Sequence, residues 1–599
     1  MLPTINPRDF LYIAPEIVLS IWGLLVLVVD FCFLNKWSAP RRRRALGYLS
    51  LLGCVATIGT TVALAGLYLE IPQLDFVSFE ADPSVFGGLI AGHQMVLWMN
   101  LVLAAMLAMV VGISMTWDFT EHWGEYYALL FWAGAGMMLL VAAEELLTLF
   151  LTLETMTLCL YMATGFEKSR RRSAEGALKY FVYGSVSSAL FLFVLSLIYW
   201  LTGTTRMEAI RAILESGMLR ADANGVSIAS RGPHVHGLAG NVAGATALLL
   251  VLVGFGFKVA AVPFHQWAPD ASEGAPAPVS AWIAAGSKLA SFVAMLKVLV
   301  HALGPWSNGP DSLLSPGWVG VVAVIAGASM TFGNLAALAQ RNLKRMLAYS
   351  SVAHAGYILV GVLAVSISLN RGEAAGAVLF YLIVYGFTTI GAFALAAWLA
   401  KDVDGDELSD LNGLGFRSPA LAVAIVLLML SLIGMPPLAG FWGKLFMFME
   451  AMRTAQSSRL TMIGLVALGL INSVISAFYY VRVLKAMFLR PPAGQVGSEP
   501  PGGIRWPIIG ATAVAVGFGV YPTPLLETAK GAATLMLTTG EAGQGTSIDP
   551  KTKLLSPEEV IARDAEISRE RSKGLSAPAI GGGGGGGAPP RRRPSPPPR

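Results

Sequence analysis

Two lysines lie in stretches of the sequence that are otherwise apolar enough to cross a membrane. Lys258 ends an apolar run that Pro263 interrupts, and Lys288 stands one third of the way into the next run. An ionisable group near the centre of a bilayer costs at least about 2.5–3.5 kcal/mol, and such groups usually face a bundle interior or a hydrated path. These positions therefore predict a functional site inside the membrane rather than a lipid-facing surface.

An acidic residue and two further lysines are candidate partners in this site. Glu154 lies in the middle of the apolar stretch 149–157, where neither capping nor snorkelling accounts for a carboxylate. Lys179 stands near the start of the following run, and Lys444 follows a Gly-Met-Pro-Pro break. A carboxylate beside a lysine alters the proton affinity of both groups. A Glu–Lys pair that separates and re-forms would therefore bind and release a proton, which predicts proton translocation.

Other charged residues are expected to lie at the membrane surface, near the ends of their spans. Glu144 and Glu145 precede Glu154 by about 15 Å along a helix axis, and we expect them to be solvated end charges. Lys297 is nearer the outer end of its run, and we expect it to snorkel to the lipid head groups. Snorkelling is also an alternative for Lys179.

Two histidines are candidates for proton relays. His265 lies in the turn after the first break, and His354 lies in the polar stretch 349–357. Because an imidazole titrates near neutral pH, His354 is suited to pass protons within a hydrated helix interior. His234 and His236 form a pair in a loop, and two ligands do not make a metal site.

Composition places the chain among membrane proteins. Of the 599 residues, 55% are hydrophobic and 13% are charged, whereas soluble domains carry about 25% charged residues. Cys32, Cys54 and Cys159 lie inside apolar runs without motif spacing, so we expect neither an iron–sulfur cluster nor a disulfide. The chain also lacks a phosphate-binding glycine fingerprint, so we expect no nucleotide site on it.

The apolar runs predict an all-α polytopic membrane protein of about 14 transmembrane helices. We expect the spans at 10–33, 45–69, 91–116, 124–143, 146–166, 175–201, 241–261, 277–301, 317–338, 346–366, 374–399, 418–452, 460–488 and 506–526. The run 418–452 is too long for one crossing and contains Gly434, Pro436 and Pro437, so it predicts a helix broken in the membrane. Breaks near a lysine in both halves predict two inverted repeats.

Basic residues predict the orientation of these spans. Clusters at 41–44, 168–172 and 341–345 fall on one side of the membrane if the span count is right. By the positive-inside rule that side is the cytoplasm, so both termini lie outside it. The loop 202–240 on the opposite side is expected to contain a short surface helix around Met207 to Leu219.

The end of the chain differs from the rest in composition. Residues 531–599 include an unbroken glycine run, Gly581 to Gly587, and end in proline and arginine. Such a segment buries too little apolar surface to fold, which predicts a polar, disordered tail. A basic tail that touches anionic head groups is the alternative. The charged segment Ser556 to Ser572 is expected to form an exposed helix.

Three stretches carry a resemblance to a known family. They are 256–270 (Gly-Phe-Lys-Val-Ala-Ala-Val-Pro-Phe-His-Gln-Trp-Ala-Pro-Asp), 273–280 (Glu-Gly-Ala-Pro-Ala-Pro-Val-Ser) and 345–357 (Arg-Met-Leu-Ala-Tyr-Ser-Ser-Val-Ala-His-Ala-Gly-Tyr). They resemble the antiporter-like membrane subunits of NADH-quinone oxidoreductase, respiratory complex I, and the likeness extends over residues 10–526. The span count and the segments around Glu154 and the following helix are most similar to the N-type subunits of that family.

The resemblance implies a role for each matched residue. Glu154 would be the fifth-helix glutamate that pairs with the seventh-helix lysine, Lys258. Lys179 would be the sixth-helix lysine, and Lys288 would link the first half-channel to a central axis. Lys444 would be the twelfth-helix residue of the second half-channel.

The resemblance also implies a division of the chain and a set of partners. It places N-terminal helices at 1–120, a first antiporter-like half-channel at 121–305, a second at 306–490, a last transmembrane helix at 491–530 and the tail at 531–599. No cofactor is expected on this chain, because NADH, FMN, the Fe–S clusters and quinone, such as ubiquinone, would be bound by other subunits.

The expected partners are other complex I subunits, above all neighbouring membrane subunits, and the lipid bilayer. No nucleic acid is expected as a partner. The expected location is the bacterial cell inner (plasma) membrane.

Three functions are open at this point. The chain is expected to be a subunit of a proton-translocating NADH:quinone oxidoreductase, a translocase, with no redox chemistry of its own. It could instead belong to a multisubunit sodium/proton antiporter that has no redox partner. The third alternative is a passive membrane scaffold whose polar residues bind neighbouring subunits.

Overall fold

The fold was analysed in a computed structural model of the chain. It describes residues 7, 9–68, 85–116, 118–216, 242–307, 317–368, 370–403, 406–453, 459–491 and 501–538. These residues belong to one compact unit that spans residues 1–540. His234, His236, the segment Ser556 to Ser572 and the glycine run lie outside the described residues.

Every regular element in the described residues is a helix, and β-type pairing is confined to three isolated bridges. In chain order the elements are α1 (Asp9–Tyr12), α2 (Ala14–Val29), η1 (Asp30–Leu34), α3 (Ala39–Tyr68), η2 (Val85–Gly87), α4 (Gln94–Ser114), α5 (Trp123–Ala142), α6 (Leu146–Thr164), α7 (Arg171–Thr202), α8 (Met207–Ser216), α9 (Val242–Lys258), α10 (Trp267–Gly274), α11 (Ala277–Trp282), η4 (Ile283–Ser287), α12 (Lys288–Leu296), η5 (Lys297–Ala302), η6 (Gly304–Trp306), α13 (Trp318–Ala339), α14 (Leu343–Ile367), α15 (Arg371–Val403), η7 (Leu408–Leu411), α16 (Leu414–Arg417), α17 (Pro419–Ile433), α18 (Ala439–Met452), α19 (Arg459–Leu489), α20 (Gly502–Val520) and α21 (Thr523–Thr538). The segments η1, η4 and η5 are π-helical, and η2, η6 and η7 are 3-10 turns.

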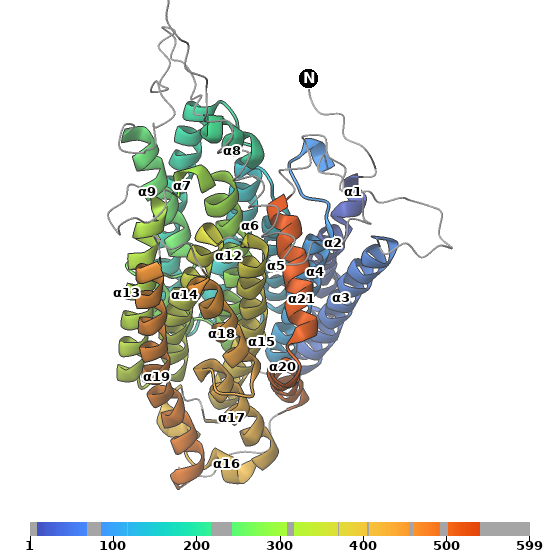
Figure 1. The fold of residues 1–599 in the computed structure, drawn as a ribbon. Coiled ribbons are helices and arrows are strands. Elements are labelled where there is room, and N and C mark those ends of the chain that lie inside the picture. Colours follow the sequence, from blue (N-terminus) through green and yellow to red (C-terminus); the bar gives the residue numbers. More distant parts are fainter. Residues whose placement is uncertain are drawn as a thin grey trace, which may run out of the picture. The chain divides into compact units, whose positions relative to one another are not determined.

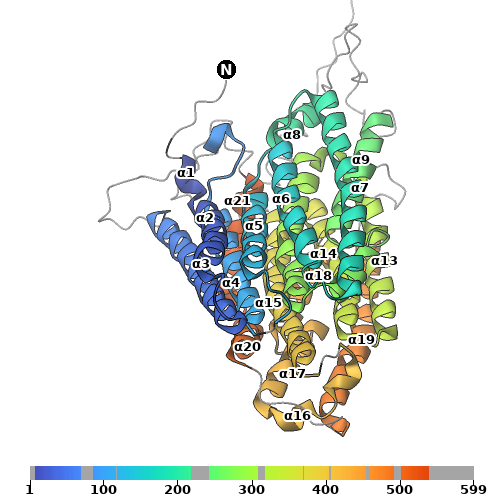
Figure 2. The same ribbon diagram turned by 180° about the vertical axis from the view of Figure 1, so that it is seen from behind.

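The long helices lie side by side as a bundle in Figures 1 and 2. Among the described residues, 12 helices are long and apolar enough to cross a membrane by length and composition. The helices at two further predicted spans, α9 and α17, are shorter than this criterion requires. The all-α membrane fold is therefore confirmed, while the exact count of 14 stays a prediction.

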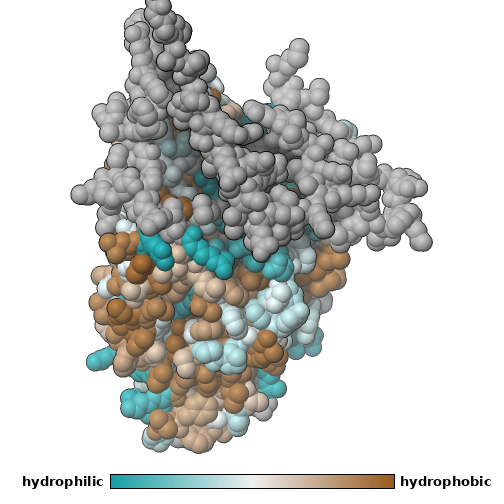
Figure 3. All heavy atoms as spheres, viewed as in Figure 1, coloured by the Kyte–Doolittle hydropathy of each residue, from teal (hydrophilic) through white to brown (hydrophobic). Residues whose placement is uncertain are grey.

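The bundle carries large apolar side chains on its outside. Phe31, Leu460 and Phe478 have exposed fractions of 77%, 82% and 66%. In Figure 3 hydrophobic residues cover much of the visible described surface. Exposed apolar area on this scale marks contact with lipid or with other membrane proteins.

The predicted break in the run 418–452 is confirmed. The helix α17 ends at Ile433, Gly434 adopts φ +94°, and α18 starts only at Ala439. A residue with positive φ after the last helical turn is a common helix end, and glycine adopts it without steric cost. Pro436 and Pro437 follow and cannot donate backbone hydrogen bonds to continue the helix.

The three basic clusters lie on one face of the helices, as predicted. Arg42 bonds the Asp30 carboxylate, with Nη2 and Oδ2 2.7 Å apart, and the same carboxylate accepts a backbone N–H from the first turn of α5. Ring contacts connect the start of α5 with the segment that follows α6, and the second basic cluster comes directly after that segment. The Glu273 carboxylate joins the other two clusters, because Nη1 of Arg172 and Nη1 of Arg345 lie 3.0 and 2.8 Å from its oxygen atoms. We call this face the basic face.

The end of the helical region differs from the prediction. The expected last span, 506–526, is divided between α20 and a further helix, α21, which extends eight residues into the predicted tail. Ala529, Ala533 and Met536 are buried, because their spacing of three to four residues gives α21 an apolar face that packs on α15. The predicted surface helix in the loop 202–240 is present as α8.

The shared position of the basic clusters generates a topological prediction. A reporter fused after Phe166 is expected to be cytoplasmic, and a reporter fused after Thr538 is expected to lie outside the cytoplasm. Paired alkaline phosphatase and fluorescent-protein fusions measure both. A cytoplasmic signal after Thr538 would contradict the orientation.

Candidate functional site

An ion pair between a partly buried glutamate and a buried lysine joins α6 to α9. Lys258 Nζ lies 3.5 Å from Glu154 Oε1, and the two side chains are 3% and 20% exposed. The Ser188 hydroxyl of α7 donates a hydrogen bond to the same carboxylate oxygen. The rings of Tyr161 and Phe257 lie 6.0 and 5.6 Å from the ammonium nitrogen. The structure thus brings together the two residues that the sequence suggested as partners.

Local backbone geometry fixes Lys258 at the end of its helix. The next residues leave the helix, since Ala260 has φ +57° and Pro263 follows. A left-handed residue and a proline both prevent the α-helical hydrogen bonds from continuing. The indole N–H of Trp267 closes the turn by donating to the Phe257 carbonyl oxygen at 3.0 Å.

A small cavity separates Lys258 from Lys288. Lys288 begins α12 directly after the π-helical segment η4, and its Nζ donates to the Ser351 carbonyl oxygen at 2.6 Å and to the Ser351 hydroxyl. The cavity has a volume of about 20 Å³ and is lined by both lysines, Ser272, Ser351 and apolar residues. This volume is large enough for about one water molecule with polar partners on the wall. One water could therefore bridge the two lysines.

Aromatic side chains continue from Lys288 to His354. The Tyr385 ring centroid lies 5.8 Å from Lys288 Nζ and 4.8 Å from the His354 ring centroid. His354 Nδ1 lies 2.5 Å from the Tyr381 hydroxyl, and His354 Nε2 lies 3.5 Å from the Tyr480 hydroxyl. A hydroxyl both donates and accepts, so either tautomer of the imidazole finds partners here.

Lys444 occupies the break in the second half of the chain. Its Nζ donates to the carbonyl oxygens of Leu432 at 3.2 Å and Ile433 at 2.9 Å. These carbonyls end α17 and have no partner within the helix, and a helix C-terminus attracts cations. The Tyr357 ring centroid lies 4.6 Å from Lys444 Nζ and 5.7 Å from the His354 ring centroid. The five groups from Glu154 to Lys444 therefore follow one another through the interior.

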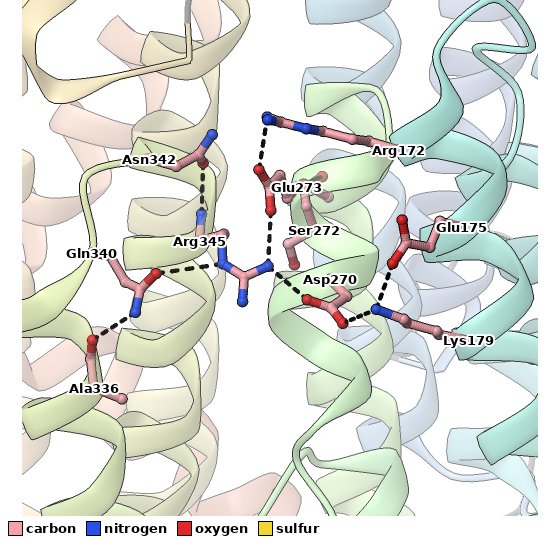
Figure 4. Close-up of polar contacts among 11 residues, drawn as sticks. Arg172, Glu175, Lys179, Asp270, Ser272, Glu273, Ala336, Gln340, Asn342 and Arg345 are labelled. Carbon is pink, nitrogen blue, oxygen red and sulfur yellow. Dashed lines mark hydrogen bonds and ion pairs between the residues drawn. The ribbon is translucent and has the colours of Figure 1, made fainter.

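Lys179 lies apart from this row of five interior groups, in an ion-pair network at the basic face (Figure 4). Its Nζ lies 2.7 Å from Glu175 and 2.8 Å from Asp270, and 40% of its side chain is exposed. Arg345 Nη1 lies 2.6 Å from Asp270 and 2.8 Å from Glu273. The ammonium is held by protein carboxylates, so neither snorkelling nor contact with Glu154 describes it in this structure.

Asp270 is the centre of that network and lies in α10, outside the membrane-length helices. Its burial works to raise the carboxyl pKa, but the hydrogen bonds from Lys179 and Arg345 outweigh burial and hold the pKa below its usual range. The carboxylate therefore stays ionised at neutral pH, and it ties α7 and α14 to the turn that follows Lys258.

The expected exposure to water or lipid head groups is wrong for Lys297 and Glu145, whereas the Glu144 side chain keeps 20% of its surface exposed. Lys297 does not snorkel, because its side chain is 1% exposed and its Nζ lies 2.8 Å from Glu144 Oε1. Glu145 is 5% exposed, and its carboxylate caps α6 by accepting the Thr148 N–H at 2.6 Å. The helix ends here are covered by neighbouring segments of the chain, so position near the end of a span did not mean exposure to solvent.

His265 lies outside the row of interior groups. It is 7% exposed, and its ring packs edge-on against Phe332 with centroids 4.7 Å apart. Among the described residues, its Nδ1 has no hydrogen-bond partner. A relay role for His265 stays a prediction without a contact to support it.

The sequence interpretation missed the neutral members of the site. Tyr381 and Tyr385 are four residues apart on α15 and therefore share one helix face, which is the signal that could have revealed them. Ser188 and Ser351 gave no such signal, since serine is common in membrane helices. Their partners lie 34 and 63 residues away in the chain.

Comparison with known proteins shows the family to which this chain belongs. The family model described as "NADH:quinone oxidoreductase/Mrp antiporter, TM" matches residues 143–476. A subunit N of NADH-quinone oxidoreductase from Anaeromyxobacter sp. is 36% identical over 533 residues, which cover 87% of this chain and 96% of the relative. The chain belongs to the NADH:quinone oxidoreductase/Mrp antiporter membrane family. The resemblance to antiporter-like subunits of complex I, and to N subunits among them, is confirmed.

Other members of the family extend the comparison. The F(420)H(2) dehydrogenase subunit N of Methanosarcina mazei is 35% identical over 88% of this chain and 99% of its own length. A chain of respiratory complex I from Thermus thermophilus is 30% identical and covers 86% of this chain and 98% of its own, with a TM-score of 0.63. A chain of the Mrp complex from Dietzia sp. has a TM-score of 0.69 at 19% identity, over 89% of this chain and all of its own, and shares the fold.

The helix break at Lys444 generates a stability prediction. Gly434→Ala places a β-carbon on a residue with φ +94° and next to the Lys444 side chain. We expect a loss of roughly 1–2 kcal/mol, measured as a lower melting temperature of the purified protein complex. Gly464→Ala is the matched control, because a β-carbon there meets open space in the middle of a helix. Equal melting temperatures for the two variants would contradict the requirement for glycine at the break.

Proposed function

We propose that this chain is the proton-translocating membrane subunit of an NADH-quinone oxidoreductase, located in a bacterial inner membrane. The observation that carries the proposal is the ion pair of Glu154 with the buried Lys258, together with the cavity that Lys258 and Lys288 line. Family membership and the N-subunit relatives support the redox complex as its setting.

The proton cycle starts at the pair. Lys258 holds a proton while the Glu154 carboxylate lies beside it, because an opposite charge stabilises an ammonium in apolar surroundings. When the carboxylate moves away, the isolated charge becomes unfavourable. Its proton then passes through a water in the cavity to Lys288, whose own Nζ is held by Ser351.

The second half of the route uses His354 and Lys444. The Tyr385 ring lies between Lys288 and His354, and the Tyr357 ring lies between His354 and Lys444. The two rings keep Lys288, His354 and Lys444 apart and exclude lipid. His354 exchanges its proton with the hydroxyl groups of Tyr381 and Tyr480. Lys444 receives the proton at the end of α17, where the carbonyls of the broken helix stabilise the ammonium.

Electron transfer belongs to other subunits in this proposal. NADH, FMN, Fe–S clusters and quinone act there, and conformational change reaches this chain through neighbouring membrane subunits. Lys179 is proposed to hold the basic face of the first half-channel together through Asp270, rather than to carry the proton within the row.

Two alternatives fit the observations less well. The sodium/proton antiporter alternative draws on the shared family model, but the Mrp chain is 19% identical whereas the redox-complex relatives reported above are 30–36% identical. A passive scaffold would place its polar residues on the outside. Lys258, Lys288 and Lys444 are instead 3–6% exposed within this chain itself.

The first prediction concerns the charge of the pair. Glu154→Gln keeps the size of the side chain and removes its charge, so proton loading at Lys258 should stall. We expect proton translocation in membrane vesicles to fall by about tenfold or more, with the complex still assembled. Glu154→Asp should retain more activity than Glu154→Gln. The control is Glu527→Gln, whose side chain is 61% exposed.

The second prediction concerns proton release. Lys258→Arg keeps a positive charge, but a guanidinium is effectively never deprotonated, so this variant should translocate about as poorly as Glu154→Gln. Normal pumping by both variants would rule out the paired-charge mechanism and favour the scaffold alternative.

A separate experiment tests whether this chain belongs to an NADH-quinone oxidoreductase. Mass spectrometry of the complex purified with this chain is expected to identify flavin and iron–sulfur subunits. Recovery of only other antiporter-type membrane subunits would instead support the sodium/proton antiporter.

A further inference from the structure

A second buried ion pair lies at the end of the helices opposite to the basic face. Lys297 Nζ donates to the carbonyl oxygens of Val141 at 2.7 Å and Ala143 at 3.1 Å, and to Glu144 Oε1 at 2.8 Å. An ammonium has three N–H groups, so all of its donors are used. Lys258 has one such partner among the described residues, Glu154. Lys297 is therefore built as a fixed positive charge, unlike Lys258.

Backbone hydrogen bonds between three chain segments hold Glu144 in place. The Glu144 N–H donates to the Leu89 carbonyl at 3.0 Å, and the Glu144 carbonyl accepts the Met207 N–H at 3.2 Å. The Ala91 N–H donates to the Ala142 carbonyl at 2.8 Å. These backbone bonds join the end of α5 to the segments before α4 and α8, and the ion pair joins it to Lys297, the first residue of the π-helical segment η5. Such π-helical turns frequently mark functional positions.

Two buried histidines flank this ion pair. His93 precedes α4 and is 4% exposed, and His301 is 3% exposed and one helical turn beyond Lys297. The charges of Lys297 and Glu144 act on both imidazoles. Both ring nitrogens of His93 and Nδ1 of His301 have no hydrogen-bond partner among the described residues. Buried polar atoms in such a position usually bond ordered water, which would also carry protons.

Partly exposed charged side chains lie on the outer side of the cluster. The helix α8 packs against η5, and its Arg211–Glu215 ion pair acts on His301 from the outer side. The Arg211 side chain is 24% exposed and the Glu215 side chain 53% exposed, so this ion pair is in contact with the surroundings of the protein. On the inner side, Lys288 and Lys297 are on one continuous helix, about 13 Å apart along its axis.

We propose that Glu144, His93 and His301, arranged around the fixed ammonium of Lys297, form a second proton-binding site that connects the helix interior with the face opposite to the basic face. The ligand is a proton, carried by the imidazole nitrogens, and the negative charge of the Glu144 carboxylate favours the protonated form of the imidazoles. Lys297 is a positioning residue, because its three bonds orient Glu144 and the end of α5. This inference rests on the proposed function and names the place where its protons cross the second face.

The test uses vesicles that contain the full complex, with the face opposite to the basic face turned inward. The double variant His93→Gln/His301→Gln is expected to lower the rate of proton delivery to the lumen by about fivefold or more. It should also flatten the dependence of that rate on luminal pH, because the glutamine side chains cannot take up protons as imidazoles do. His122→Gln is the matched control, since this histidine is 51% exposed at the start of α5 on the basic face.

A second comparison separates a fixed charge from a proton carrier. Lys297→Arg is expected to keep most of the translocation, because an arginine retains the charge and the donors, whereas Lys297→Met should lose it. At Lys258 the expectation is the opposite, because the arginine variant there should lose proton translocation. Assembly is checked for every variant by native gel electrophoresis, and if the double variant does not assemble, the single histidine variants decide.

The outcomes distinguish this inference from the proposed function. A wild-type rate and pH profile in assembled histidine variants, beside a strongly impaired Glu154→Gln, would overturn the second site and leave the proposed function standing. Normal translocation by Glu154→Gln would overturn the proposed function itself. Loss of translocation in Lys297→Arg as complete as in Lys258→Arg, in an assembled complex, would contradict the fixed charge.

Discussion

The structure depends on a single electrostatic constraint, which is the cost of keeping an ammonium group away from water. A charge buried without partners is far more costly than any packing contact is favourable. Each interior lysine meets this constraint differently. Lys258 has a carboxylate, Lys288 has the oxygen atoms of one serine, and Lys444 has the carbonyls at a helix end. In the proposed mechanism, the strength and mobility of those partners separate lysines that exchange protons from lysines that are fixed.

The helix breaks follow from the same constraint. An unbroken helix in a membrane uses all of its carbonyl groups internally, and only an interruption leaves carbonyls free to bind a cation. The break at Gly434 provides the two carbonyls that bind Lys444. The break after Lys258 lets the turn with Asp270 reach the basic face, where Lys179 and Arg345 bind it. Interruptions of secondary structure are thus the means by which the fold accommodates charge.

Much of this arrangement could be predicted from the sequence, and the remainder depends on tertiary contacts. The break in 418–452 could be anticipated because glycine and proline interrupt a helix. The pairing of Glu154 with Lys258 could be anticipated because a charged residue in an apolar run needs a partner. The ion pairs of Lys179 with Asp270 and of Lys297 with Glu144 could not, since these partners lie 91 and 153 residues away in the chain. For Lys297 the position near a span end suggested exposure, but segments before α4 and α8 cover that end. The helix α21 was missed because the composition of the tail hid its short apolar face.

Infrared difference spectroscopy of the complex, recorded between rest and turnover, tests the central claim most directly. In the proposed cycle, the Glu154 carboxylate changes its environment each time Lys258 releases a proton. A carboxylate band should therefore shift on turnover in the wild type and in Glu527→Gln, and that band should be missing in Glu154→Gln. Identical difference spectra for the wild type and Glu154→Gln, at equal amounts of assembled complex, would contradict the claim that this pair separates and re-forms during the cycle.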